Sequence, residues 1–256
     1  LASAIPTHMS FEEAAVLPLA ISTASSALFQ SDQLGLRHPT AVTPPTGQAV
    51  VVWGGSTSVG SNAIQLAVAA GYTVVTTASP HNHERMRELG ASEVFDYSSP
   101  TAVRDIAQVL KGRSVAGILA VGTGSAEPCV AIAAATGAKR VSMASPSVSF
   151  GEVPRRKGLS KALMRVGVQM VTRTAALQSR CAVRGIRARF VWGSTLMNNE
   201  VGPMLWEHYL PAALAEGRHV LAPPAHVVGN GLANVQTAMD QLRLGVSGQK
   251  LVISLP

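Results

Sequence analysis

The chain has 256 residues, of which 47% are hydrophobic and 14% are charged, and its formal net charge is +7. This composition excludes an intrinsically disordered chain, the two cysteines exclude a disulfide-stapled secreted fold, and no apolar run reaches the ~18 residues of a membrane span. The length allows one large domain or two small ones. No secretory signal is recognisable at the N-terminus, so a cytoplasmic protein is expected. The first residue is not Met, which indicates a fragment or a processed chain.

The first predicted element is a helix that begins at a capping box. Ser10 and Glu13 have the spacing at which each side chain bonds the backbone N–H of the other residue. Pro18 is expected to interrupt this helix, and residues 20–29 are predicted to form a second one. Residues 37–47 contain three prolines and no periodicity, which predicts a linker.

Short Val-rich segments then alternate with helical ones. Strands are predicted at residues 49–53, 72–77, 94–97, 116–121 and 140–144, and helices at 59–70, 80–90, 101–110 and 127–136. Ser-Pro pairs precede two of these helices and supply an N-cap with proline at the first helical position. The alternation predicts βαβ units and a parallel sheet covered on both faces, which is a doubly wound α/β fold.

This alternation ends after residue 146, where a basic segment begins. Between Glu152 and Glu200 there is no acidic residue but ten basic ones, so the remainder of the chain has 11 basic and 14 acidic residues. The ten are Arg155, Arg156, Lys157, Lys161, Arg165, Arg173, Arg180, Arg184, Arg187 and Arg189. The segment contains helix formers but no convincing amphipathic stripe. One alternative is therefore an interaction module in which a structural core carries this segment to an acidic partner or RNA.

Nucleic-acid binding is disfavoured because aromatic side chains do not interleave with these basic residues. Phe190 and Trp192 stand only at the end of the segment, so stacking on bases has little support.

A sixth strand is predicted at residues 190–192 and a helix at 201–215. The tail is predicted to contain a strand from residue 227, a helix at 232–244 and a strand at 250–255.

The sharpest chemical signal is a glycine-rich turn at residues 53–60, which follows one predicted strand and opens a helix. In that context such a turn is typical of dinucleotide binding. Gly55 would allow the tight turn and Gly60 the close packing of helix on strand, while the helix N-terminus offers N–H groups to a pyrophosphate. Thr57 occupies the position of the middle glycine. An ordinary strand-to-helix turn is the alternative, and the βαβ context favours the cofactor.

The end of the second strand indicates which dinucleotide is bound. NAD enzymes commonly place an acidic residue there to hold the ribose 2′-hydroxyl. Residues 76–83 contain no carboxylate, and the first one is Glu84. Hydroxyls, an amide, a second helix N-terminus and nearby Arg85 suit a 2′-phosphate instead, so NADP is the predicted cofactor.

Several blocks of the chain resemble the zinc-independent fungal enoyl reductases of the medium-chain dehydrogenase/reductase superfamily. They are residues 53–60, 79–82 and 94–97, with further blocks at 10–20 and 244–252. The resemblance covers residues 5–145 and 190–256. It implies a Rossmann fold with remnants of a GroES-like catalytic domain at both ends. Residues 1–45 would be a remnant with linking helices, 46–222 the NADP-binding domain and 223–256 the C-terminal return to the catalytic domain.

The same resemblance implies the site residues. Gly55, Ser56, Thr57, Ser58, Val59 and Gly60 would follow the pyrophosphate and its ribose, and Ser79, His81 and Asn82 would surround the 2′-phosphate, with Tyr97 beside the adenosine. Ala144 and Ser145 would approach the nicotinamide, and Val246 and Ser247 would close over the cofactor. Ala20, Ile21, Ser22 and Thr23 would border the acyl-substrate cleft. No catalytic residue is assigned.

The implied chemistry is hydride delivery from NADPH to the β-carbon of an enoyl thioester, followed by protonation of the α-carbon. The substrate would be a small molecule or carrier-bound, and a polyketide synthase is a candidate partner. A quinone reductase is the related alternative.

Two departures from the family stand out. Most of the GroES-like domain has no counterpart in the chain, so weak or absent turnover is expected. Residues 158–189 would be an atypical Arg-rich insertion or misread non-coding sequence.

Other sites have little support. Cys129 and Cys181 have no neighbouring His, and no His, Cys and Glu spacing suggests a metal site, so none is predicted. The serines of the glycine turn do not form the GxSxG pattern of a hydrolase. Membrane association is not expected.

Overall fold

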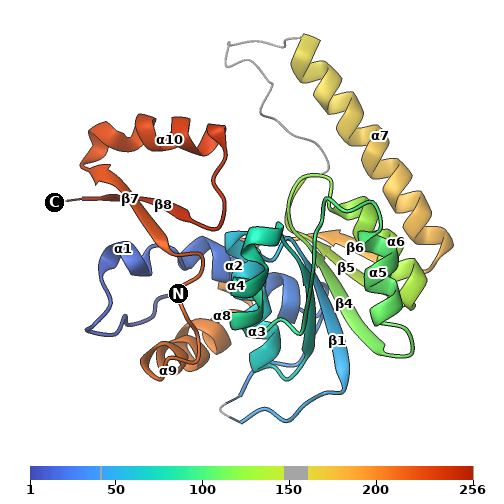
Figure 1. The fold of residues 1–256 in the computed structure, drawn as a ribbon, viewed down its shortest axis with the longest axis horizontal. Helices are drawn as coiled ribbons and strands as arrows, with labels where there is room; N and C mark the ends of the chain where they lie inside the picture. Colours follow the sequence, from blue (N-terminus) through green and yellow to red (C-terminus); the bar gives the residue numbers. More distant parts are fainter. Residues whose placement is uncertain (41, 147–160, 256) are drawn as a thin grey trace.

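The computed structural model describes residues 1–40, 42–146 and 161–255, and its centre is a six-stranded parallel sheet (Figure 1). The strands are β1 (Gln48–Trp53), β2 (Thr73–Thr77), β3 (Glu93–Phe95), β4 (Ser114–Ala120), β5 (Arg140–Met143) and β6 (Arg187–Phe190). Their order in the sheet is β3-β2-β1-β4-β5-β6. This is the doubly wound order of a dinucleotide-binding sheet, in which the direction of winding reverses between β1 and β4. The predicted α/β fold is confirmed.

Helices cover both faces of the sheet (Figure 1). In chain order the structure has α1 (Phe11–Ala14), α2 (Pro18–Phe29), α3 (Ser58–Ala69), α4 (His83–Glu88), α5 (Ala102–Val109), α6 (Ala126–Thr136), α7 (Lys161–Val183), α8 (Val201–Pro203), α9 (Leu210–Ala215) and α10 (Val235–Leu244). A π-helical turn, Met204–Tyr209, joins α8 to α9. Short 3-10 helices lie at Pro80–Asn82, Gly193–Asn198 and Leu232–Asn234.

The sheet has a hydrophobic core on each face, and the side chains of β1 alternate between the two cores. Val50 and Val52 pack into the cluster formed with α2, α3 and α4, while Val51 packs with α5, α6 and α7 on the other face. Successive side chains of a strand point to opposite faces, so a Val-rich strand is buried on both. Every residue of Ala49–Trp53 is buried. This strand therefore carries the glycine turn on a rigid base.

The N-terminal capping box forms as predicted. The Ser10 hydroxyl accepts from the Glu13 N–H at 3.2 Å, and the Glu13 carboxylate accepts from the Ser10 N–H at 2.9 Å. Pro18 does not merely interrupt a helix but starts α2, at the first helical position. Proline fits there because it has no backbone N–H, and an N–H at the first helical position would have no intrahelical acceptor.

The Arg-rich segment has more regular structure than its sequence pattern predicts. Residues 161–183 form α7, and β6 begins at Arg187 rather than at Phe190. Among the described side chains of α7, only Leu177 and Cys181 are buried. The apolar stripe is thus confined to the last turns, which explains why periodicity did not reveal the helix. The expected strand at 190–192 was placed too late because β6 is an edge strand with exposed arginines.

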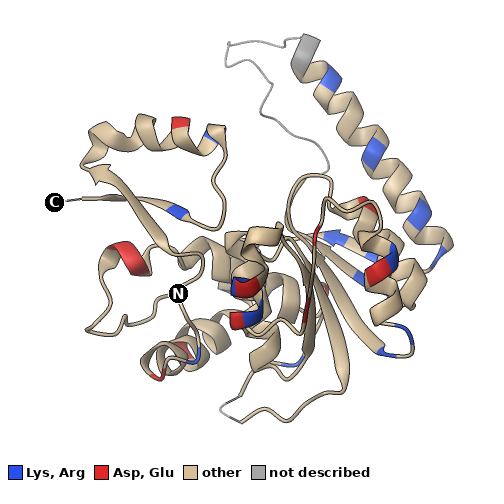
Figure 2. Ribbon diagram, in the orientation of Figure 1, with Lys and Arg blue, Asp and Glu red and all other residues tan. Residues whose placement is uncertain are grey.

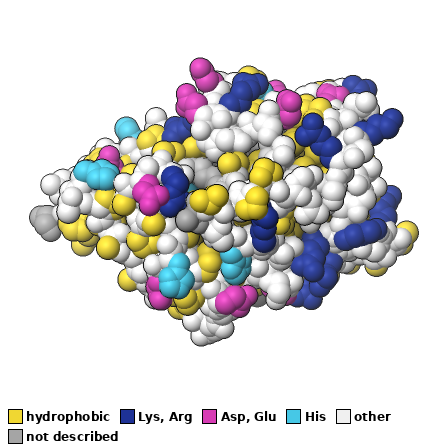
Figure 3. Space-filling view, turned by 90° about the horizontal axis from the view of Figure 1, so that it is seen from below, with side chains coloured by type: hydrophobic (Ala, Val, Ile, Leu, Met, Phe, Trp, Pro, Cys, Tyr) yellow, Lys and Arg dark blue, Asp and Glu magenta, His cyan; other side chains and the backbone are white. Residues whose placement is uncertain are grey.

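Basic side chains lie along α7, which extends away from the sheet (Figure 2). A view from below shows Lys and Arg gathered toward the right-hand end of the molecule, while the left-hand end carries few of them (Figure 3). Arg189 forms an ion pair with Asp32 at 3.2 Å, and both side chains are about half exposed. An exposed pair of this kind contributes little to stability.

A second, smaller sheet pairs β7 (Ala225–Asn230) in parallel with β8 (Lys250–Ser254), and α10 is their crossover helix. This unit lies beside α1 (Figure 1), and the Ser254 hydroxyl donates to the carboxylate of Glu12. Helix α1 and strand β8, which are far apart in the sequence, are therefore in contact. Among the described helices, none combines the length and apolar character needed to cross a membrane.

Candidate functional site

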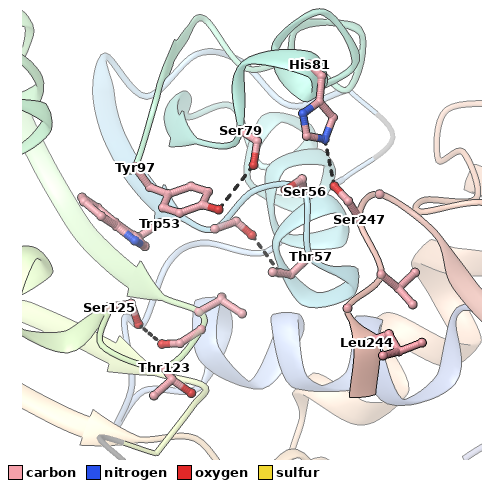
Figure 4. A pocket seen from close by; sticks show the side chains of 16 residues that line it. Trp53, Ser56, Thr57, Ser79, His81, Tyr97, Thr123, Ser125, Leu244 and Ser247 are labelled. Carbon is pink, nitrogen blue, oxygen red and sulfur yellow. Dashed lines mark hydrogen bonds between the residues drawn. The ribbon is translucent and has the colours of Figure 1, made fainter. Parts of the chain in front are cut away.

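A groove of about 520 Å³ runs along the carboxyl ends of β1 to β4 (Figure 4). Its described lining residues are Trp53, Gly54, Ser56, Thr57, Ser79, His81, Tyr97, Val121, Gly122, Thr123, Ser125 and the segment 244–248. Ligands of open α/β sheets bind outside the carboxyl ends of the strands, where the winding reverses. The groove occupies that place between β1 and β4.

The floor of the groove is the glycine turn after β1. Gly54 has a φ of +85°, and a Cβ at this position would lie 2.6 Å from the Val121 carbonyl oxygen. The tight turn is thus made by Gly54, and not by Gly55 as the sequence suggested. Gly55 is required instead because the turn packs closely against α3: a Cβ at Gly55 would lie 2.9 Å from Cδ1 of Ile64. A Cβ on Gly60 would lie 2.8 Å from Cα of Gly55, so α3 packs directly on the turn.

Thr57 is an N-cap, which explains why glycine is not needed there. Its φ of −74° and ψ of 161° are extended values that any residue adopts. Its hydroxyl donates to the Gly54 carbonyl at 2.7 Å and accepts from the Gly60 N–H at 3.0 Å. Ser58 and Val59 open α3, and the amides of a first helical turn have no intrahelical partner. These amides and the helix dipole suit an anion.

A cluster of polar side chains lies at the end of β2. The Ser79 hydroxyl donates to the Tyr97 hydroxyl at 3.4 Å. His81 Nε2 lies 2.9 Å from Ser247 Oγ, and the Asn82 amide donates to the same oxygen at 3.2 Å. Figure 4 shows His81 and Ser247 facing each other across one wall of the groove. The structure thus brings together residues from both halves of the predicted site.

The C-terminal segment 244–248, which carries Ser247, completes this wall. Gly245 and Gly248 have φ values of +99° and +62°, which let the backbone turn between α10 and β8. The Arg85 guanidinium donates to the Gly248 carbonyl at 3.3 Å, so the segment is held against α4. Val246 and Ser247 both line the groove.

Other predicted residues lie outside this groove. Ala144 and Ser145 follow β5, where the Ser145 hydroxyl accepts from the Gly122 N–H at 2.8 Å. Ala20 and Ile21 are buried in α2, and Ser22 and Thr23 are half-buried there. None of these is among the described residues that line the groove, and neither are Gly55, Ser58, Val59, Gly60 and Asn82, although these five lie beside it in the turn, in α3 and before α4. Their roles stay predictions.

Sequence reasoning missed the contribution of the loop after β4. Val121, Gly122, Thr123 and Ser125 line the groove, and the Ser125 hydroxyl donates to the Gly122 carbonyl at 2.6 Å. The sequence carries no motif for these residues, because they reach the groove only through the pairing of β4 with β1. Trp53, the last residue of β1, stands in the predicted turn at residues 53–60, but no role was assigned to it.

A buried polar network supports α3 from behind. His219 Nε2 lies 2.9 Å from Asn62 Oδ1, and the Asn62 amide donates to the carbonyls of Ser58 at 2.8 Å and Ala222 at 3.0 Å. Burial lowers the pKa of His219 to about 4, so its imidazole is neutral near pH 7. The network fixes the first turn of α3 to the chain that leads into β7.

The described parts of the chain contain no group of three His, Cys, Asp or Glu residues that could hold a metal ion. Burial raises the pKa of the Cys129 thiol well above its usual range, which makes it unsuitable as a nucleophile.

Known proteins resemble the whole of this chain. No family model matches it. Dehydrogenase pigH of Monascus ruber is 45% identical over 257 residues, covering 100% of this chain and 68% of that protein. Trans-enoyl reductase himH of Aspergillus japonicus is 39% identical over 258 residues, covering 100% of this chain and 66% of that protein. The chain thus spans about two thirds of these relatives.

Solved structures share the fold. The CurK enoyl reductase aligns with a TM-score of 0.69 at 19% identity, over 99% of this chain and 65% of that one. CurA from Vibrio vulnificus, solved in complex with NADPH, aligns with a TM-score of 0.66 at 18% identity, over 98% of this chain and 66% of that one. The identity to pigH and himH shows that the chain belongs to the enoyl reductase group of the medium-chain dehydrogenase/reductase superfamily, a family of oxidoreductase enzymes, and the solved structures show that it shares their fold.

Proposed function

We propose that the groove binds NADPH and that the chain takes part in reducing the α,β-double bond of an enoyl thioester. The observation that carries this proposal is the groove itself, which joins the first amides of α3 to the cluster of polar side chains at the end of β2. Those residues fit a dinucleotide, because Gly54, Gly55 and Gly60 let the turn pack directly against β4 and α3, which brings the first amides of α3 to the groove.

The preference for the phosphorylated cofactor rests on the cluster around Ser247. Ser79, His81 and Asn82 supply hydroxyl, imidazole and amide groups, and Arg85 lies one helical turn further on. A carboxylate among them would repel a 2′-phosphate, and Glu84 does not line the groove. These side chains would hold the adenosine end, while Val121 to Thr123 face the opposite end.

When bound, NADPH supplies the hydride that forms the new C–H bond at the β-carbon, while a proton completes the α-carbon and NADP⁺ is left. The protein's part is to orient the dinucleotide, and α3 and the segment 244–248 are the elements that do so. We further propose that the thioester is presented as a small molecule or on an acyl carrier of a polyketide synthase, in the cytoplasm. The family membership supports this substrate class.

A fluorescence titration with NADPH and NADH tests the cofactor assignment. We expect NADPH to bind at micromolar concentration and at least about tenfold more tightly than NADH, as charge-assisted contacts to a phosphate would give. Absence of binding by either below millimolar concentration would contradict the dinucleotide site. Tighter binding of NADH would contradict the phosphate assignment while leaving the site intact.

A further inference from the structure

A second cavity, of about 380 Å³, lies between α7 and the carboxyl ends of β5 and β6. Six of its eight described lining residues are apolar, and the other two are Ser145 and Thr174. The apolar ones are Met143, Pro146, Met170, Leu177, Phe190 and Trp192. We call this cavity the α7 pocket. Its volume lies within the range that small-molecule sites occupy.

Several large apolar side chains of the pocket are exposed to solvent. Trp192 is 67% exposed, Met170 41% and Phe190 38%. The rings of Phe190 and Trp192 meet edge to face with centroids 5.3 Å apart, which forms a firm aromatic wall. A ligand that covers this wall gains from removing apolar area from water. Its complement is therefore an uncharged apolar chain and not a phosphate or a peptide backbone.

The α7 pocket continues the cofactor groove along the same edge of the sheet. The groove is lined from the ends of β3, β2, β1 and β4, and the pocket from the ends of β5 and β6. The two meet where the Gly122 N–H donates to Ser145 Oγ at 2.8 Å, because Gly122 lines the groove and Ser145 lines the pocket. Ser79 and His81 hold the adenosine end at β2, so the reacting end of the dinucleotide would point toward β4 and the pocket.

We propose that the α7 pocket binds the apolar tail of the acyl substrate, with the thioester end directed toward the groove. This inference rests on the proposed function, and it assigns the tail to α7 and β6 rather than to residues 20–23. Ala20 and Ile21 are buried in the core, which leaves α2 little apolar surface to offer there. Chain-length selectivity would then be a property of the Arg-rich segment, whose helix supplies Met170, Thr174 and Leu177.

Calorimetric titration of the 256-residue chain with saturated acyl N-acetylcysteamine thioesters of four to twelve carbons tests this, without any cofactor. We expect the affinity to rise by up to about fourfold with each methylene until the pocket is full. Thr174→Trp fills the pocket from the exposed face of α7 and should reduce the affinity for the longer thioesters at least tenfold. Thr172→Trp is the matched control, since Thr172 is exposed on the same helix and does not line the pocket.

The two proposals fail in different ways. Affinity that does not depend on chain length, or equal effects of Thr174→Trp and Thr172→Trp, would overturn the α7 pocket even if NADPH binds normally. Length-dependent binding that Thr174→Trp abolishes would support the pocket even if neither nucleotide binds. NADPH titration of both variants should give the wild-type affinity, because neither residue lines the groove.

Discussion

His81 Nε2 and Ser247 Oγ lie 2.9 Å apart although 166 positions separate them in the chain. The contact closes the groove between the start of α4 and the segment that joins α10 to β8. Because Asn82 donates to the same hydroxyl, Ser247 is held by two side chains at once. The C-terminal segment is therefore part of the groove that we propose binds the cofactor, and not only a return to the small sheet.

Removing the Ser247 hydroxyl should open this wall. We expect Ser247→Ala to weaken NADPH binding by about fivefold, the effect of one hydrogen bond of ordinary strength, with a smaller effect on NADH. Fluorescence titration measures both. Gln249→Ala is the control, because Gln249 is exposed and lies outside the groove. Equal losses for the two nucleotides would show that Ser247 closes the groove without contacting the 2′-phosphate.

A carboxylate at the end of β2 should reverse the cofactor preference. Ser79→Asp places a negative charge where the 2′-phosphate is proposed to bind and supplies an acceptor for a ribose 2′-hydroxyl. We expect NADPH affinity to fall at least about tenfold while NADH affinity rises or is unchanged. Ser92→Asp adds the same charge at an exposed position outside the groove and should leave both affinities as in the wild type. An unchanged NADPH-to-NADH ratio in Ser79→Asp would contradict the assignment.

Thr57 should contribute to the stability of the fold as well as to the shape of the turn. Thr57→Ala removes both hydroxyl bonds, to Gly54 and from Gly60, and should lower the free energy of unfolding by about 1 kcal/mol. Thr57→Ser keeps the hydroxyl and should retain most of the stability. Urea unfolding followed by circular dichroism measures the difference. A Ser variant as unstable as the Ala variant would show that the methyl group, and not the cap, matters.

Local patterns predicted most of the fold, because the parallel strands are buried on both faces and the helices between them carry their own caps. Val50 to Val52 and the Ser10 capping box could be read directly. Elements whose secondary structure depends on packing against distant parts of the chain could not be predicted in this way. Helix α7 buries only Leu177 and Cys181 among its described side chains, and β6 is an edge strand next to β5, so neither shows a period of its own.

The candidate site also contains residues that local patterns predict and residues that they do not. The glycine turn and the end of β2 were recognisable because each follows a strand in sequence. Val121 to Ser125 carry no motif, and they reach the groove only because β4 pairs with β1. Trp192 belongs to the α7 pocket only because β6 pairs with β5. Sheet order, which the sequence does not state, decides these positions.

His219 should make the fold sensitive to mild acid. Its pKa is lowered by burial from 6.5 to about 4, so between those values the unfolded chain binds a proton that the folded chain does not. The free energy of unfolding should therefore be highest above pH 6.5 and should fall as the pH is lowered from 6.5 to 4. The full effect of this group is on the order of 3 kcal/mol, from about 1.4 kcal/mol per pH unit.

Urea unfolding at pH 7.0, 6.0 and 5.0 measures the slope, and His219→Gln should reduce it because the replacement does not titrate. The amide of Gln can still donate toward Asn62 Oδ1, so the variant keeps a partner for the residue that holds the first turn of α3. His226→Gln is the matched control, since His226 is exposed on β7 and lies outside this network. A slope unchanged in His219→Gln would mean that the acid sensitivity arises elsewhere and that the buried imidazole is not the group that titrates.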